Sequence, residues 1–143
     1  MTQEKKHDPD CIFCKIISEE FPCFKVFENE NILAFLDIFP VNLGHIIIVP
    51  KEHHENIYQI DEESLIQITK LSKMLATRLK NKLDCPGVNI LQNNGKASGQ
   101  EVSHYHMHII PRFENDKMEL NFNSNPAPIQ SKDAQIILNK LLN

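Results

Sequence analysis

The alternation of apolar and polar positions predicts a mixture of strands and helices along this 143-residue chain. Residues 24–28 (FKVFE) and 31–37 (NILAFLD) are short apolar segments on either side of a polar turn, a pattern typical of a β-hairpin. Residues 44–51 (GHIIIVPK) are strongly β-branched and are bounded by Gly44 and Pro50. This segment is therefore expected to be a buried strand.

Residues 61–82 (DEESLIQITKLSKMLATRLKNK) show the clearest helical pattern. Acidic residues crowd its start, and Lys80 and Lys82 lie near its end, which suits the helix dipole. Apolar residues recur at helical spacing and form one broad stripe: Leu65, Ile68, Leu71, Met74, Leu75 and Leu79.

The remaining segments are shorter. Residues 11–18 indicate a short helix or turn, residues 87–93 a further strand, and residues 131–142 a last helix with Ser131 as candidate N-cap. Together these elements predict an α+β fold with an antiparallel sheet of about five strands, one long helix and short terminal helices. We expect a flexible tail at 1–10, a domain core at 11–113, and a C-terminal loop and helix at 114–143 packed on the same domain.

Composition narrows the classes of function. The formal net charge of −4 and a sequence pI near 5.9 argue against a broad electrostatic grip on nucleic acid. The apolar runs are too short to cross a bilayer, and residues 1–10 lack the apolar core of a signal peptide. With four cysteines (Cys11, Cys14, Cys23, Cys85) and no export signal, we expect a cytoplasmic protein whose thiols are free or metal-bound.

Three histidines occupy alternate positions in the segment SHYHMHIIPR, from Ser103 to Arg112. In a strand, His104, His106 and His108 would share one face, about 6.5–7 Å apart. A neutral imidazole is a good nucleophile toward phosphorus, and the central His106 would have a polar partner on each side. A metal site and a solvated strand face remain alternatives for such a row.

Two further features bear on this choice. Asn93, Gly99 and Gln100 precede the histidines and could present amide groups to a phosphate. Cys11 and Cys14 form a Cys-x-x-Cys pair, which is compatible with a zinc site or with a redox pair. The aromatic residue and thioredoxin-like context that usually accompany a redox pair are missing, which favours metal binding.

The segment GQEVSHYHMHIIPR resembles the signature of the histidine triad (HIT) family, His-φ-His-φ-His-φ-φ with φ hydrophobic. The segments CIFCKII, VFENENILAFLDI, GHIIIVPKEH, NNG and GQ also follow the order and spacing of that family. The resemblance covers about residues 11–113 and is closest to the zinc-bearing, Hint-like bacterial branch. It implies a HIT-like fold.

The resemblance also implies roles for individual residues. His106 matches the nucleophile that attacks the α-phosphorus, His108 its phosphate-contacting partner, and His45 a fourth active-site histidine; His104 completes the catalytic set. Asp37 matches the carboxylate that accepts both ribose hydroxyls. The remaining nucleotide-binding positions form an apolar purine slot and a phosphate side: Ile12, Phe13, Ile16, Phe35, Ile38, Asn93, Gly99, Gln100, Glu101 and Val102. Core packing alone would also explain the apolar members of this set.

Two positions need comment. In zinc-bearing members of the family, the metal ligands match Cys11, Cys14, His53 and His104, with His54 as the neighbouring residue that could be mistaken for a ligand. Glu101 departs from the Ser or Thr that is common after the Gln of the family, and a carboxylate repels phosphate. Either the Glu101 side chain turns outward and only its backbone N–H contributes, or the preference shifts toward less negative or amine-bearing substrates. We expect the first of these.

The function implied by the resemblance is a nucleotide phosphoramidase. It would cleave the P–N bond of adenosine 5′-phosphoramidates through a nucleotidyl-histidine, with a structural zinc and without a requirement for magnesium. Its partner would be a purine nucleotide rather than nucleic acid or a membrane, and the chain is expected to form a homodimer. A dinucleoside polyphosphate hydrolase and a zinc-stabilised nucleotide-binding module with little catalysis are the alternatives.

Overall fold

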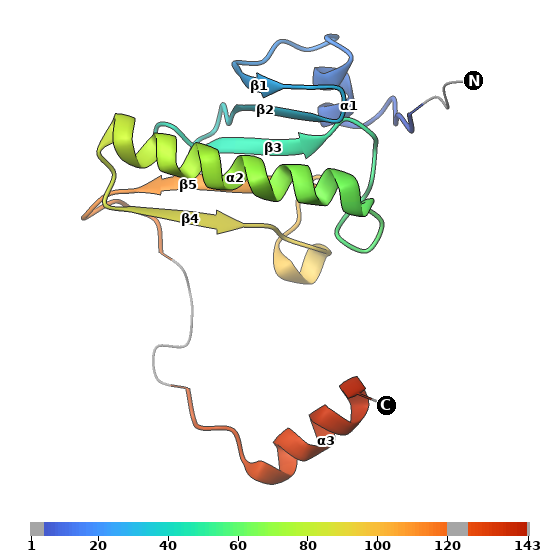
Figure 1. Ribbon diagram of the computed structural model, residues 1–143, viewed down its shortest axis with the longest axis vertical. Helices are drawn as coiled ribbons and strands as arrows, with labels where there is room; N and C mark the ends of the chain where they lie inside the picture. Colours follow the sequence, from blue (N-terminus) through green and yellow to red (C-terminus); the bar gives the residue numbers. More distant parts are fainter. Residues whose placement is uncertain (1–4, 120–125, 143) are drawn as a thin grey trace.

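The computed structural model describes residues 5–119 and 126–142 and has the predicted α+β architecture (Figure 1). Within these residues it contains one five-stranded sheet, one long helix and shorter helices near both ends. The elements are α1 (Ile12–Ile17), β1 (Lys25–Glu28), β2 (Ile32–Leu36), β3 (Ile46–Pro50), α2 (Glu62–Leu83), β4 (Gly87–Leu91), a 3₁₀ turn (Lys96–Ser98), β5 (Met107–Arg112) and α3 (Ser131–Leu142).

The sheet has the strand order β1-β2-β3-β5-β4, and every neighbouring pair is antiparallel. The predicted hairpin is present as β1 and β2. Its turn is stabilised by Asn29, whose side-chain oxygen accepts hydrogen bonds from the backbone N–H groups of Asn31 and Ile32 at 2.8 and 2.9 Å. An asparagine that bonds to the backbone two residues on is a common turn former.

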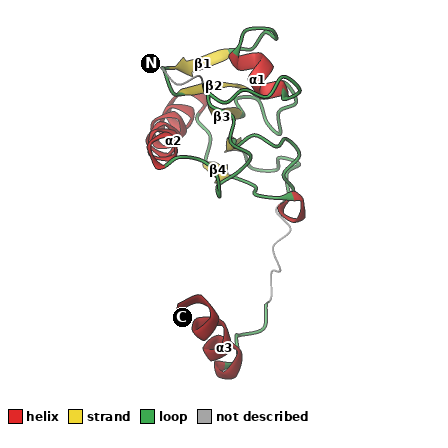
Figure 2. Cartoon of the chain, turned by 90° about the vertical axis from the view of Figure 1, so that its right-hand side faces the viewer, coloured by secondary structure: helices red, strands yellow, loops and turns green. Residues whose placement is uncertain are grey.

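Each face of the sheet packs against a different helix. The long helix α2 crosses one face, where Ile46 and Ile48 of β3 join most of the apolar stripe of the helix in one cluster (Figure 1). Met74, which was predicted to belong to this stripe, is exposed instead. Helix α1 lies on the opposite face (Figure 2), where Ile47 and Val49 belong to one cluster with Phe13. Strand β3 therefore reads as a continuous apolar run because both of its faces are covered.

The register of the central strands decides where the histidines point. Ile109 pairs with Ile46 and belongs to the cluster under α2. His108 pairs with Ile47 on one side and with Leu91 on the other. Because side chains alternate across a strand, His108 faces away from α2, on the side of the sheet that carries α1.

The ends of α2 are well defined by local interactions. Asp61 caps the first turn, since its Oδ2 accepts a hydrogen bond from Ser64 N at 2.9 Å. Near the other end, Gly44 has a φ of +99°, and an added Cβ would lie only 2.6 Å from Leu83 Cδ1. Glycine at this position therefore permits both the backbone conformation and the close approach that bring His45 to the start of β3.

The predicted histidine strand starts later than expected. Strand β5 begins at Met107, so His104 and His106 precede it. The ladder between β3 and β5 covers only Ile46–Ile48 with Met107–Ile109, and further along the His104 ring bonds to the carbonyl of Pro50 at 2.8 Å. Tyr105 N instead donates to His54 O, at 2.6 Å, outside the sheet. Of the three histidines, only His108 therefore lies within the hydrogen-bonded part of β5.

The C-terminal helix α3 lies apart from the sheet in Figure 1, and none of its residues is buried. Apolar side chains such as Ile137 and Leu141 are therefore exposed in a single chain. The expected packing of residues 114–143 on the domain and the expected homodimer remain predictions. None of the helices within residues 5–119 and 126–142 is long and apolar enough to cross a bilayer.

Candidate active site and metal-binding cluster

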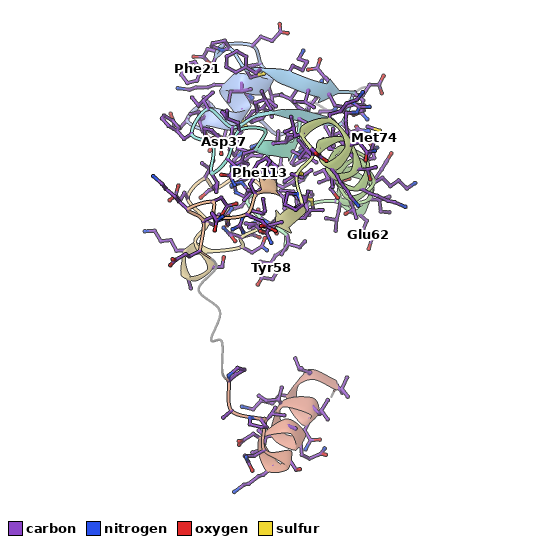
Figure 3. The ribbon with its side chains drawn as sticks, turned by 90° about the vertical axis from the view of Figure 1, so that its left-hand side faces the viewer. Phe21, Asp37, Tyr58, Glu62, Met74 and Phe113 are labelled. Atoms are coloured by element: carbon purple, nitrogen blue, oxygen red, sulfur yellow. The ribbon has the colours of Figure 1, made fainter. Side chains whose placement is uncertain are left out.

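A cavity of about 480 Å³ lies on the face of the sheet opposite to α2. Figure 3 shows this arrangement, with Asp37 on one side of the sheet and Glu62 and Met74 of α2 on the other. The cavity brings together nearly all of the predicted catalytic and nucleotide-binding residues: Ile12, Phe13, Ile16, Phe35, Asp37, Ile38, His45, Asn93, Gly99, Glu101, Val102, His106 and His108.

Two predicted residues do not line this cavity. The Gln100 amide donates to Glu55 O at 2.7 Å and to Val102 O at 3.0 Å, while its oxygen accepts from Gly95 N. Gln100 thus holds the loop in place, and its side chain is not aimed at a phosphate. The ring of His104 is fully buried and lies among the cysteines and His53. Of its two predicted roles, only that of metal ligand fits this position.

His106 is oriented by a single backbone group. Its Nδ1 lies 2.7 Å from the carbonyl oxygen of His104. Because a carbonyl can only accept, Nδ1 must carry the proton, and Nε2 is left with a free lone pair. Burial lowers the pKa of His106, which keeps the ring neutral, while Asp37 and Glu101 oppose this shift. The arrangement gives a neutral imidazole with a fixed tautomer.

His45 and His108 form a directional hydrogen-bond chain. Val41 N donates to His45 Nδ1 at 3.2 Å, and His45 Nε2 lies 2.9 Å from His108 Nδ1. Since His45 Nδ1 accepts, its Nε2 carries the proton and donates to His108, which leaves His108 Nε2–H as the last donor of the chain. Burial lowers the pKa of His45, and it lowers the pKa of His108 to about 4. Both rings are therefore neutral near pH 7.

Asp37 is the carboxylate of the cavity. Its Oδ1 accepts from Phe39 N at 2.9 Å, and its Oδ2 lies 3.6 Å from His45 Nε2. These contacts hold the carboxylate without using all of its acceptor capacity, so it can still accept hydrogen bonds from a ligand. Glu101 is exposed at the same cavity and places a second negative charge there.

A second cluster lies beside the cavity and consists of Cys11, Cys14, His53 and His104. Cys11 is the N-cap of α1 and Cys14 lies three residues on, so their sulfur atoms converge. Cys14 Sγ is 3.4 Å from His53 Nδ1 and 3.6 Å from His104 Nδ1, and the two nitrogens are 3.2 Å apart. His104 Nε2 donates to Pro50 O, which leaves Nδ1 free to bind a metal.

These distances fit a tetrahedral zinc ion. Zinc bonds of about 2.0–2.1 Å to nitrogen and about 2.3 Å to sulfur imply ligand atoms about 3.3–3.8 Å apart. The observed spacing of the nitrogen and sulfur atoms, 3.2–3.6 Å, falls close to this range. Four protein ligands would leave no open position for water, so the donor set is that of a structural site.

Several contributors to the cavity were missed from the sequence. Val41 acts through its backbone N–H, which no residue pattern indicates. Leu91 lines the cavity because β4 pairs with β5 opposite His108, which alternation alone does not reveal. Cys23 and Met118 also line the cavity, although neither of them was assigned a role at a binding site from the sequence.

The comparisons with known proteins agree with this geometry. The family model of the HIT domain matches residues 18–115. The chain belongs to the HIT family. A HIT family protein from Bacillus subtilis is similar in structure, with a TM-score of 0.85 and 39% identity over 92% of this chain and 94% of that chain. The likeness extends over nearly the whole of both chains.

Two further HIT relatives carry informative names. The adenosine 5′-monophosphoramidase HNT1 of Saccharomyces cerevisiae is 47% identical over 105 residues, which cover 73% of this chain and 64% of the yeast protein. A Zn-bound histidine triad family protein from Mycobacterium smegmatis has a TM-score of 0.73 and 32% identity, over 81% of this chain and 84% of that chain.

Proposed function

We propose that this HIT protein hydrolyses adenosine 5′-phosphoramidates to AMP and an amine, through a nucleotidyl intermediate on His106. The observation that carries the proposal is the bond from His106 Nδ1 to the carbonyl of His104, because it leaves the Nε2 lone pair of this neutral, cavity-lining ring free. The name of the yeast relative supports the choice of substrate class.

The cavity supplies a binding position for each part of the nucleotide. The purine would pack among apolar side chains that include Phe13 and Phe35. The carboxylate of Asp37 would accept hydrogen bonds from the two ribose hydroxyls. This placement would bring the α-phosphorus toward His106 and His108. Asn93 and Gly99 line the same cavity and would lie on the phosphate side. Positioning of this kind accounts for a large part of phosphoryl-transfer catalysis.

The reaction proceeds in two displacements. His106 Nε2 attacks the α-phosphorus, the P–N bond to the amine breaks, and its electron pair leaves with the nitrogen, which takes up a proton. Water then attacks the phosphorus, the bond to His106 breaks, and AMP is released with the imidazole restored. The Nε2–H of His108 is the donor available to the phosphate or to the departing nitrogen.

The amine leaving group is favoured over a second nucleotide by Glu101. Glu101 lines the cavity and its negative charge acts on His106, so it would repel the additional negative charges of a polyphosphate leaving group. An amine is neutral or positively charged and meets no such repulsion. Dinucleoside polyphosphate hydrolysis is therefore the less favoured activity of the same site.

We also propose that Cys11, Cys14, His53 and His104 hold a structural zinc. The spacing of their donor atoms and the Zn-bound relative support this assignment. The ion would anchor α1 to the segment that precedes β5. Zinc would thus fix the position of the His104 carbonyl, on which the orientation of His106 depends.

The test is the variant His106→Asn, compared with His7→Asn, a histidine substitution at an exposed position outside the cavity. We expect His106→Asn to remain folded, to bind AMP, and to lose at least about 10³-fold in kcat, because the nucleophile is removed. Quenching the wild type during turnover in denaturant at alkaline pH, where an N–P bond to histidine survives, should trap an AMP adduct on His106. A folded His106→Asn variant with undiminished AMP release would refute the proposal.

A further inference from the structure

His54 is a buried residue that the proposed function does not use. Its side chain follows His53 in the chain but points to a different cluster, and the residue is only 8% exposed. Among the described residues, its Nε2 is a buried polar atom without a hydrogen-bond partner. A buried ring nitrogen without a partner is unfavourable, so the residue calls for an explanation.

Two carboxylates face this nitrogen. His54 Nε2 lies 3.4 Å from Asp61 Oδ1 and 3.7 Å from Glu52 Oε2, and the three donor atoms lie within 4.8 Å of one another. The two oxygens of Asp61 are used differently. Oδ2 caps α2 by accepting from Ser64 N, which leaves Oδ1 turned toward His54. The carboxylates are partly exposed, so the cluster is accessible to solvent from their side.

We propose that His54 Nε2, Glu52 Oε2 and Asp61 Oδ1 form a second divalent-cation site, separate from the cysteine cluster. One imidazole and two carboxylates are a donor set that zinc and similar first-row metal ions accept. Metal–ligand bonds of about 2.0–2.2 Å in a tetrahedral site require donor atoms about 3.3–3.6 Å apart. The two distances from His54 Nε2, 3.4 and 3.7 Å, lie in or close to this range.

The donor set gives this site a different character from the cysteine cluster. With three protein ligands, one position remains for water or for an exogenous ligand. Without thiolates, the site is expected to bind its ion more weakly and to exchange it with solvent more readily. Two consecutive residues would then bind different ions: His53 in the closed structural site, and His54 in the open site whose ion exchanges.

The location connects the ion to the active-site segment. The backbone carbonyl of His54 accepts a hydrogen bond from Tyr105 N at 2.6 Å, and Tyr105 lies between His104 and His106. An ion bound by His54 and Asp61 would therefore link the start of α2 to the segment that carries His106. We expect binding of the ion to stabilise the folded chain, because it binds only when these elements are assembled.

The experiment measures zinc per chain after equilibrium dialysis at buffered micromolar free Zn²⁺. The variants are His54→Gln, Glu52→Gln and Asp61→Asn, and the last retains a good N-cap for α2. The matched control is Glu63→Gln, which removes a carboxylate from the first turn of α2 outside the cluster. Circular dichroism and the melting temperature establish that each variant is folded.

We expect the wild type and Glu63→Gln to bind one zinc beyond the cysteine cluster. Each cluster variant should lose that ion or bind it at least about tenfold more weakly. Added Zn²⁺ should raise the melting temperature of the wild type but not that of His54→Gln. The comparison is needed because Asp37, His45 and His108 also lie close enough together to bind an ion.

The proposal is overturned if the folded cluster variants take up as much zinc as the wild type with equal affinity. It is equally overturned if the wild type binds no ion beyond the cysteine cluster. Either result would mean that His54 is held by its two carboxylates alone. Because Glu52 is partly exposed, its substitution tests the site even if His54→Gln fails to fold.

Discussion

The carbonyl oxygen of His104 lies 2.7 Å from Nδ1 of His106, while the ring of His104 faces Cys11 and Cys14. His104 therefore contributes to two sites: its backbone carbonyl orients His106 at the cavity, and its ring belongs to the cysteine cluster. The hydrogen bond sets the tautomer of His106, and the ring position depends on the cysteine cluster. Under the proposed function, this connection makes the cysteine cluster part of the positioning of His106.

Cys14→Ser should reduce both zinc content and activity. Removing one thiolate from a structural zinc site should cost about 3 kcal/mol or more of folding free energy, and lower the melting temperature by about 10 °C or more. The measurements are zinc per chain, the melting temperature and kcat. Cys23→Ser, at a cysteine outside the cluster, should leave the zinc content and melting temperature unchanged. Equal zinc content in the two variants would contradict the assignment.

His108 should make stability depend on pH in the acidic range. Burial lowers its pKa from 6.5 to about 4, so between these values the unfolded chain binds a proton at this ring that the folded chain does not. The contribution of His108 to stability should therefore fall as the pH drops from about 6.5 to about 4, and stay constant below that range.

The comparison is with His108→Gln, whose amide oxygen can still accept a hydrogen bond from His45. Denaturant unfolding at a series of pH values should show the wild type losing stability relative to the variant as the pH falls through this window. Parallel curves for the two proteins would show that the pKa of His108 is not lowered on folding.

Asp37→Asn should weaken discrimination between ribose and 2′-deoxyribose substrates. A carboxylate can accept from both hydroxyls, whereas an amide presents one oxygen and one donor group. We expect the wild type to prefer the ribose substrate by about tenfold or more in kcat/KM, and the variant to show a ratio near one. Glu114→Gln, at an exposed position, should keep the wild-type ratio. A preserved preference in Asp37→Asn would place the ribose elsewhere.

Glu101→Gln should shift the choice of leaving group. Removing the negative charge at the cavity should raise kcat/KM for a diadenosine polyphosphate by about fivefold, equivalent to about 1 kcal/mol of repulsion, with little effect on an AMP–amine substrate. The quantity to measure is the ratio of the two kcat/KM values. Glu20→Gln, an exposed acidic residue that does not line the cavity, serves as the control. An unchanged ratio would mean that the Glu101 carboxylate does not influence the leaving group.

Patterns of burial made much of the fold predictable. The helix expected at 61–82 is observed at Glu62–Leu83, because most of the predicted apolar stripe packs against the sheet. The strand expected at 44–51 is observed at Ile46–Pro50. The start of β5 was predicted too early, because histidines at alternate positions resemble a strand even in residues that are not hydrogen-bonded to a neighbouring strand. Side-chain identity does not report where a neighbouring strand stops.

The candidate site shows a similar division. Residues whose chemistry lies in the side chain, such as Asp37 and His106, could be named from the sequence, and they line one cavity. Gln100 was assigned to the phosphate although its amide is committed to the loop. The contributions of Val41 N and His104 O could not be predicted, since every residue carries these backbone groups and only the folded chain selects which ones act.

Because His104 contributes to both the cysteine cluster and the orientation of His106, binding of the metal would also bring His106 into its active orientation. A preparation short of zinc would then resemble an active-site mutant in its kinetics while having an intact sequence. Specific activity per chain would depend on the fraction of chains loaded with zinc as well as on the rate of the loaded enzyme. Adding zinc back to such a preparation would recover turnover without any change in the amount of protein.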